Sequence, residues 1–447
     1  MAEYGQIDDA GLAQHPPQTP ALKALLFINF IASFGYSLVF PFLVVLVTAW
    51  GGNALIYGLI GASYAGFQFV GAPLLGRLSD RIGRRKVLII SQTGTALAWV
   101  LFLVAFTLPQ TVIWQSAEDA ALRLTLPVLA LMLARALDGL TGGNVSVANA
   151  LVADLSTEQT RRKQFARMGM ASNLGTIVGP TLAGLFSVIS LSAVFPVAGA
   201  LLISCVGIVL VARLPRSTTS DQRCAKAGER AGVSQSLGHS PHHYHGAEHR
   251  RSMVEILSLP YVTFVLFTYF LAFFGFSLFF VAFPLYALTG LGWGSAELGL
   301  FFAVMSGGTI LIQGPVLTRL SKRFSEAALI SMGAASQAAG FCLFAFAGEA
   351  GALAAIPLLA FGNGIVLPSF MSCIAELAPA EEQGAVQGFA SSTMSLANIS
   401  GLSLGGIAYG VFGPVFMVAP AFCLAGVSAL ALLYIRQIQL KRPASLS

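Results

Sequence analysis

Long apolar stretches separated by short polar segments run along most of this 447-residue chain. Each stretch has about 20 residues, the length that a helix needs to cross a hydrocarbon layer about 30 Å thick. The stretches are continuously apolar and do not alternate as membrane-barrel strands would, so they predict helices. Twelve spans are predicted, at residues 22–48, 56–76, 87–108, 126–152, 166–188, 192–212, 258–288, 298–318, 327–348, 352–375, 385–411 and 415–436.

The composition agrees with a membrane protein and excludes an ordinary soluble one. Charged residues make up 10% of the chain, against about 25% in an average soluble protein. The net charge of +6 does not predict nucleic-acid binding, because the cations sort to one side of the predicted spans. All of the 25 Lys and Arg residues except Arg123 and Arg135 fall on the side of the N-terminus. This sorting predicts a multi-pass protein, in a bacterial inner (plasma) membrane, with both termini in the cytoplasm.

The two halves of the chain resemble each other, which indicates a duplicated six-helix unit. The stretch SFGYSLVF at 33–40 aligns with FFGFSLFF at 273–280, and APLLGRLSDR at 72–81 aligns with GPVLTRLSKR at 314–323. The predicted order is a cytoplasmic tail (1–21), a six-helix bundle (22–213), a cytoplasmic His- and Arg-rich linker (214–257), a second six-helix bundle (258–436) and a cytoplasmic tail (437–447).

Three motifs identify a family. GRLSDRIGRRKVL at 76–88 joins the second and third spans, RALDGLTGG at 135–143 lies in the fourth, and GTIVGPTLAG at 175–184 lies in the fifth. Together they resemble motifs of the major facilitator superfamily, and within it the twelve-helix drug:proton antiporters of the tetracycline-resistance type. The resemblance implies an all-α membrane fold of two pseudo-symmetric six-helix bundles that works by alternating access.

The first motif is interpreted as a cytoplasmic gate. Gly76 and Gly83 would allow close backbone approach, and Asp80 would suit the positive end of a helix; the resemblance implies that this is the eleventh span. Arg84 could then pair with Asp154. Alternatively, the cations of the motif only set the topology. The gate residues are Gly76, Asp80, Arg81, Gly83, Arg84, Arg85 and Asp154. The copy in the second half has Thr318, Lys322 and Ser325 in place of Gly76, Asp80 and Gly83.

Asp138 and Arg135 are the candidates for proton coupling. They lie three residues apart, on one face of the fourth span. A charge at the centre of a membrane helix costs about 2.5–3.5 kcal/mol or more, so such residues are functional candidates. The pair could instead be a neutral structural ion pair. The matching position in the second half is Asn363, which does not titrate.

The fifth span carries the residues Gly175, Gly179, Pro180 and Gly184, which are either an antiporter motif, as the resemblance implies, or generic small-residue packing. The central cavity is expected to be aromatic and nearly uncharged, which suits an amphipathic ligand. Its candidate residues are Asn29, Phe34, Tyr36, Gln68, Asn144, Phe274, Phe276, Gln313, Asn363 and Asn398.

The resemblance implies an exporter of amphipathic, drug-like molecules, as in multidrug efflux, driven by proton antiport. Ala32 stands where tetracycline antiporters usually carry an acid, so a uniporter, or an exporter of a specific metabolite or lipid without proton coupling, stays open. A membrane enzyme or sensor is a remote alternative. GLSLG at 401–405 fits a hydrolase pattern, but it lies within a predicted span and lacks a histidine partner.

We expect no catalytic residues, no metal site and no bound cofactor, with a proton gradient as the possible energy source. Five histidines at 239–249 could bind a metal loosely or belong to a linker of biased composition. The expected partners are a small-molecule substrate and the lipid bilayer, with no nucleic acid, and the functional unit is expected to be a monomer.

Overall fold

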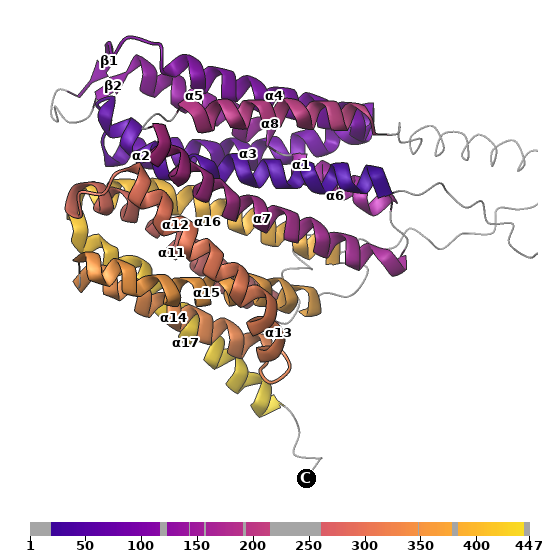
Figure 1. Cartoon of the computed structure of the whole chain (residues 1–447). Helices are drawn as coiled ribbons and strands as arrows, with labels where there is room; N and C mark the ends of the chain where they lie inside the picture. The colour runs from indigo at the N-terminus through magenta and orange to yellow at the C-terminus, as the bar shows by residue number, and fades with distance from the viewer. Residues whose placement is uncertain are drawn as a thin grey trace, which may run out of the picture.

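The computed structural model describes residues 19–116, 123–142, 144–155, 158–190, 194–214, 261–346, 348–377 and 383–441. Nearly all of these residues are helical (Figure 1). The first half contains α1 (Thr19–Leu38), α2 (Phe40–Ala49), α3 (Ala54–Ile82), α4 (Arg84–Ala105), α5 (Leu126–Thr141), α6 (Asn144–Leu155), α7 (Glu158–Ser190) and α8 (Val194–Ala212). The second half contains α11 (Val262–Gly290), α12 (Ser295–Leu311), η1 (Ile312–Val316), α13 (Leu317–Leu320), α14 (Glu326–Phe346), α15 (Gly348–Leu377), α16 (Gln383–Phe412), η2 (Gly413–Met417) and α17 (Val418–Lys441).

The helices confirm a membrane-spanning fold. Eight stretches of the described residues are long and apolar enough to cross a bilayer, and Pro196–Ala212 is a shorter apolar helix. One of the eight, Phe389–Tyr434, covers two of the predicted spans. The prediction of a helical membrane protein is therefore confirmed, and the number of twelve spans stays a prediction.

Three of the predicted spans are interrupted, each near a helix-breaking residue. Span 22–48 divides at Val39, where Pro41 opens α2, because proline has no backbone N–H to continue the ladder. Span 126–152 divides at Gly142. Span 298–318 contains the π-helical turn η1, which holds Pro315. A π-helical turn within a helix, such as η1, is frequent at functional sites.

The first motif is helical, which corrects the prediction of a loop after the second span. α3 continues to Ile82 and α4 starts at Arg84, so only Gly83 separates the two helices. Arg77 and Arg81 therefore lie on the last turns of α3. The hydropathy pattern ended the span too early because it responds to charge, whereas a helix can extend beyond the apolar layer.

A small hairpin that the sequence did not predict marks one end of the molecule. β1 (Val112–Gln115) pairs antiparallel with β2 (Arg123–Thr125) between α4 and α5 (Figure 1). The Thr125 hydroxyl donates a hydrogen bond of 2.8 Å to the carbonyl of Trp50, just before α3. The start of α3 therefore lies at this end, which we call the hairpin end.

The helices gather into two groups that follow the two halves of the sequence (Figure 1). In the first group α1 packs on α7, and α4 and α5 pack on each other. In the second group α14 packs on α15 and α17, and α11 packs on α16. The groups meet mainly where α3 packs on α16 and α7 packs on α12, and α2 also contacts α11 and α12. The predicted linker at 214–257 and both tails lie largely outside the described residues.

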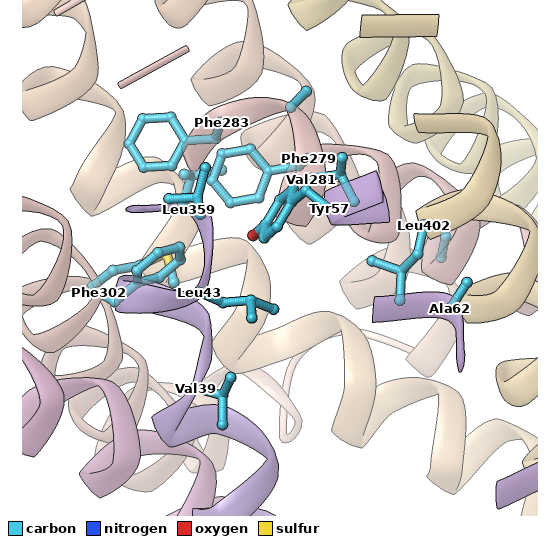
Figure 2. Packing of buried hydrophobic residues seen from close by; sticks show 14 of the residues in the cluster. Val39, Leu43, Tyr57, Ala62, Phe279, Val281, Phe283, Phe302, Leu359 and Leu402 are labelled. Carbon is cyan, nitrogen blue, oxygen red and sulfur yellow. The ribbon is translucent and has the colours of Figure 1, made fainter. Parts of the chain in front are cut away.

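The α3–α16 contact brings the two backbones together at the hairpin end. A Cβ on Gly58 would lie 2.5 Å from the Leu402 carbonyl oxygen, and one on Gly406 would lie 2.6 Å from that of Ala54. Figure 2 shows Tyr57 of α3 among Phe279 and Val281 of α11, and Ala62 of α3 beside Leu402 of α16. One buried apolar cluster thus continues across both halves.

The packing supports the internal repeat. Gly175 of α7 lies against the backbone of α1 at Phe30 and Phe34, and Gly401 of α16 lies against α11 at Phe274 and Ser277. Phe34 and Phe274 are equivalent in the repeat, since the aligned stretches 33–40 and 273–280 differ by 240 positions. The duplicated sequence therefore builds the same helix crossing twice.

Candidate functional site

A cavity of about 180 Å³ lies between the two halves. Its first wall comes from α1 and α7, and its second from α11, α12, η1, α14 and α15. The residues of the first wall are Tyr36, Ser37, Thr176, Ile177 and Pro180. Those of the second wall are Ala272, Phe273, Phe276, Phe280, Phe302, Met305, Ser306, Thr309, Gln313, Gln337, Asn363, Val366 and Leu367.

Four of the ten residues predicted for a central cavity line this one, namely Tyr36, Phe276, Gln313 and Asn363. Five others lie outside its lining, where they join helices to each other or pack within them. The amide of Asn29 donates to the Met168 carbonyl at 2.8 Å, and Asn398 accepts from Ser277 at 2.7 Å. Gln68 donates to the Tyr64 hydroxyl at 3.2 Å. Phe34 and Phe274 stack on Phe30 and Phe270. The side chain of Asn144 lies outside the described residues.

The sequence reasoning missed several lining residues, above all Gln337. Its side chain donates a 2.6 Å hydrogen bond to Asn363 Oδ1. The repeat offered a signal for it: the 242-residue offset between 72–81 and 314–323 pairs Gln337 with Thr95. Gln313 reaches the cavity from η1.

Arg135 and Asp138 form a buried ion pair at the end of α5. Arg135 Nη1 lies 3.2 Å from Asp138 Oδ2, and the two side chains are 3% and 11% exposed. Thr95 of α4 lies beside the Asp138 carboxylate. Each charge therefore has a partner inside the helix group, as burial requires.

Two tyrosines separate this ion pair from the cavity. The guanidinium carbon of Arg135 lies 4.4 Å from the ring centre of Tyr64 and 5.8 Å from that of Tyr36. The two rings are 4.8 Å apart, and Tyr36 also lines the cavity. Two aromatic rings in close contact and a cation over an aromatic face are favourable arrangements. A continuous path of contacts therefore joins the cavity to Asp138.

The second half repeats this arrangement without charges. Asn363 is equivalent to Asp138 and Gln337 to Thr95, so the Gln337–Asn363 hydrogen bond stands where Thr95 contacts Asp138. Both amides line the cavity, whereas Asp138 lies behind Tyr64 and Tyr36.

The structure separates the roles predicted for the first motif. Gly83 has φ of +95°, a conformation that favours glycine, so its turn requires this residue. A Cβ on Gly76 would meet nothing within 4 Å, so the part of the chain that the structure describes makes no close approach there. Arg85 donates to the carbonyl of Ala212, which ties α4 to the end of α8. Arg81 is exposed, Arg84 lies on the first turn of α4, and the side chains of Asp80 and Asp154 lie outside the described residues.

The motif of the fifth span packs α7 on α1 and also reaches the cavity. A Cβ on Gly175 would come within 2.3 Å of the Phe30 carbonyl oxygen, and one on Gly179 within 2.2 Å of Ser37 Oγ. Pro180 lines the cavity. Gly184 lies on α7, and its surroundings are outside the described residues.

We expect Gly175→Val to destabilise the protein by about 1–3 kcal/mol, because the added carbons would force α1 and α7 apart. Thermal unfolding in detergent measures the effect. Gly169→Val is the control, since Gly169 lies on the same helix and a Cβ there would meet nothing within 4 Å. Equal unfolding temperatures for the two variants would contradict this account of the motif.

Comparison with known proteins identifies the family. The model described as Major Facilitator Superfamily matches residues 25–401 and, in a second match, residues 265–446. The chain belongs to the major facilitator superfamily. It is 29% identical over 385 residues to the class D tetracycline resistance protein of Salmonella ordonez, covering 86% of this chain and 87% of that one. It is 26% identical over 420 residues to major facilitator superfamily domain-containing protein 10 of Mus musculus, covering 88% and 81%.

A solved structure shows the same fold. The crystal structure of the human organic anion transporter MFSD10 (TETRAN) superposes with a TM-score of 0.61 at 21% identity, covering 94% of this chain and 99% of that one. The predicted resemblance to tetracycline-resistance proteins and the predicted all-α membrane fold of this superfamily are therefore confirmed, whereas the count of twelve spans stays a prediction.

Membership makes this protein a membrane transporter and not an enzyme. In agreement, the hydrolase-like stretch at 401–405 is a regular part of α16, where Gly401 packs on α11. The histidine cluster at 239–249 lies outside the described residues.

Proposed function

We propose that this superfamily member exports amphipathic small molecules by alternating access in exchange for protons. The supporting observation is the path from the cavity through Tyr36 and Tyr64 to the Arg135–Asp138 ion pair. The cavity has walls from both halves, so moving one half against the other would open it to either side of the membrane.

Asp138 is the proposed proton carrier. When ionised it pairs with Arg135, and when protonated it loses that charge pairing. Arg135 then interacts mainly with the rings of Tyr64 and Tyr36. Because Tyr36 lines the cavity, a change at Asp138 would alter the wall that a bound molecule contacts. Substrate and proton would thus compete through the same two rings.

The proposed location is a bacterial inner membrane, with both termini in the cytoplasm. The sorting of Lys and Arg supports this orientation, and the similarity to the Salmonella protein supports a bacterial membrane. The hairpin end would then face outward, because it lies opposite the cationic turn between α3 and α4.

The test is gradient-driven transport in proteoliposomes made with the full-length protein. The probes are radiolabelled chloramphenicol, an uncharged aromatic amide, and tetracycline, the drug in the name of the class D relative. With an acidic lumen, we expect at least one probe to accumulate several-fold. Asp138→Asn should abolish this accumulation and retain exchange of labelled for unlabelled probe, because only the proton step is lost.

Glu297→Gln is the control, since this exposed carboxylate accepts a hydrogen bond from Gly294 N–H at the start of α12, far along the chain from the ion pair. It should transport like the wild type. If probe accumulation is the same with and without the gradient, and the same in the wild type and in Asp138→Asn, proton coupling is wrong and a uniporter is favoured. If the wild type neither accumulates nor exchanges either probe, the proposal of drug export fails.

A further inference from the structure

The described lining of the central cavity contains no ionisable acid or base other than the phenol of Tyr36. The nearby ion pair does not change this, because Tyr36 and Tyr64 cover the guanidinium of Arg135 and Asp138 is neutralised by it. A charged ligand would therefore lose its hydration in the cavity without gaining a counter-ion. Such burial is unfavourable for either sign of charge.

The polar side of the cavity is a pair of amides held in place by the backbone. Gln337 Nε2 donates to Asn363 Oδ1, and among the described residues Asn363 Nδ2 donates to the weakly accepting sulfur of Met305, 3.8 Å away. Gln337 lies directly against Gly362, where a Cβ would come within 2.2 Å of its side chain. α15 therefore fixes the position of the Gln337 side chain on α14.

This pair keeps one carbonyl oxygen and three N–H groups, one of which points at the Met305 sulfur. An amide side chain has one acceptor oxygen and two N–H donors. The internal hydrogen bond uses the oxygen of Asn363 and one N–H of Gln337. The oxygen of Gln337 stays available to accept from a donor of the ligand, and Asn363 Nδ2 stays available to donate to an adjacent acceptor, as in a carboxamide.

The apolar side of the cavity suits a flat ring. Phe280 and Phe302 stack at 5.8 Å with an angle of 7°, and Phe276 meets the edge of Phe280 at 4.8 Å. Ile177 and Pro180 form part of the opposite wall. The volume of about 180 Å³ fits one or two fused rings, since a cavity of about 150 Å³ holds benzene.

We propose that the cavity binds uncharged planar molecules that carry a carboxamide or an equivalent donor–acceptor pair, and that it discriminates against organic anions and cations. The rings would lie on Phe276, Phe280 and Phe302, and the amide would hydrogen-bond Gln337 and Asn363. This inference rests on the proposed function, because it names the substrate class of the same cavity.

The test is direct binding to the purified full-length protein in lipid nanodiscs, with no gradient imposed. Three ligands share one ring system and differ in charge: 2-naphthamide, 2-naphthoate and 2-naphthylmethylammonium. We expect 2-naphthamide to bind at least tenfold more tightly than either ion. Asn363→Leu and Gln337→Leu should each weaken its binding about tenfold.

Two further variants make the result specific. Asn398→Leu removes an amide that bonds Ser277 outside the cavity lining, so it should leave 2-naphthamide binding unchanged. Asn363→Asp places a carboxylate in the cavity and should turn the preference toward 2-naphthylmethylammonium. Size-exclusion chromatography and thermal unfolding identify any variant that fails to fold. If one of Asn363→Leu and Gln337→Leu does not fold, binding to the other variant tests the proposal.

The proposal is overturned if an ion binds as well as 2-naphthamide, if none of the three ligands binds, or if the leucine variants at 337 and 363 bind like the wild type. None of these outcomes depends on transport. If 2-naphthamide binds as expected but the proteoliposomes show no gradient-driven transport, proton-driven export is rejected and this binding site is retained.

Discussion

Arg135→Leu is expected to destabilise the protein by about 3–5 kcal/mol, because it leaves the Asp138 carboxylate buried without its partner. Asp138→Leu should cost a similar amount, since the guanidinium of Arg135 is equally buried. The double variant Arg135→Leu/Asp138→Leu should recover most of the loss, because no unpaired charge is left. Thermal unfolding of the purified proteins in detergent, converted to free energies of unfolding where the transition is reversible, measures all three.

The control for this series is Arg319→Leu, which removes an exposed cation on α13 and should unfold like the wild type. Equal losses in the double variant and in the single variants would contradict the pairing. The comparison also separates two roles of Asp138. If the ion pair is only structural, the double variant should be stable and a proton gradient should still drive its transport. If Asp138 carries the proton, the double variant should be stable but the gradient should no longer drive transport.

Gly58→Val should open the contact between α3 and α16 at the hairpin end. The first added carbon would lie 2.5 Å from the Leu402 carbonyl oxygen and 3.0 Å from Gly406 Cα, so the two backbones must separate. We expect transport to fall at least tenfold, because the two halves could no longer close at this end. Ala62, which is 7% exposed beside this contact, should become accessible to solvent.

The accessibility is measured by the reaction of Ala62→Cys with a membrane-impermeant maleimide, in a chain whose five native cysteines are replaced by alanine. Gly66→Val is the matched control, since it makes the same change two turns further along α3, where a Cβ would meet nothing within 4 Å. Equal labelling of the two glycine variants would show that the Gly58 contact does not hold this end closed.

The fold was largely predictable from the sequence because lipid imposes a simple rule on it. A spanning segment must be apolar over a fixed length and satisfy its own backbone, so the hydropathy pattern located the helices. The boundaries were less predictable. Charged residues lower the hydropathy of a segment but do not end its helix, so the hydropathy pattern predicts a loop where Gly83 alone separates α3 from α4.

The candidate site was predictable only in part, for a geometric reason. The sequence singled out Asp138 and Arg135, because a charge within an apolar span is visible without any structure. Which face of a helix meets the cavity depends on helix rotation, and the helices here are apolar on nearly all sides. Asn398 and Asn363 are therefore alike in the sequence, although one bonds Ser277 and the other lines the cavity. The internal repeat could have pointed to Gln337. In the repeat, Gln337 is equivalent to Thr95 and Asn363 is equivalent to Asp138, so Gln337 is expected beside Asn363.

The single residue between α3 and α4 has a mechanical consequence. Because one residue spans at most about 3.6 Å, the ends of the two helices cannot slide apart, and the bend between them is made at the positive φ of Gly83. The α3–α4 pair therefore acts as a stiff elbow. α3 contacts the second half through α16, and α4 contacts α5, which holds the ion pair. α3 also packs directly on α5, so a tilt of α3 against α16 would reach the helix of Asp138 both through this contact and through α4.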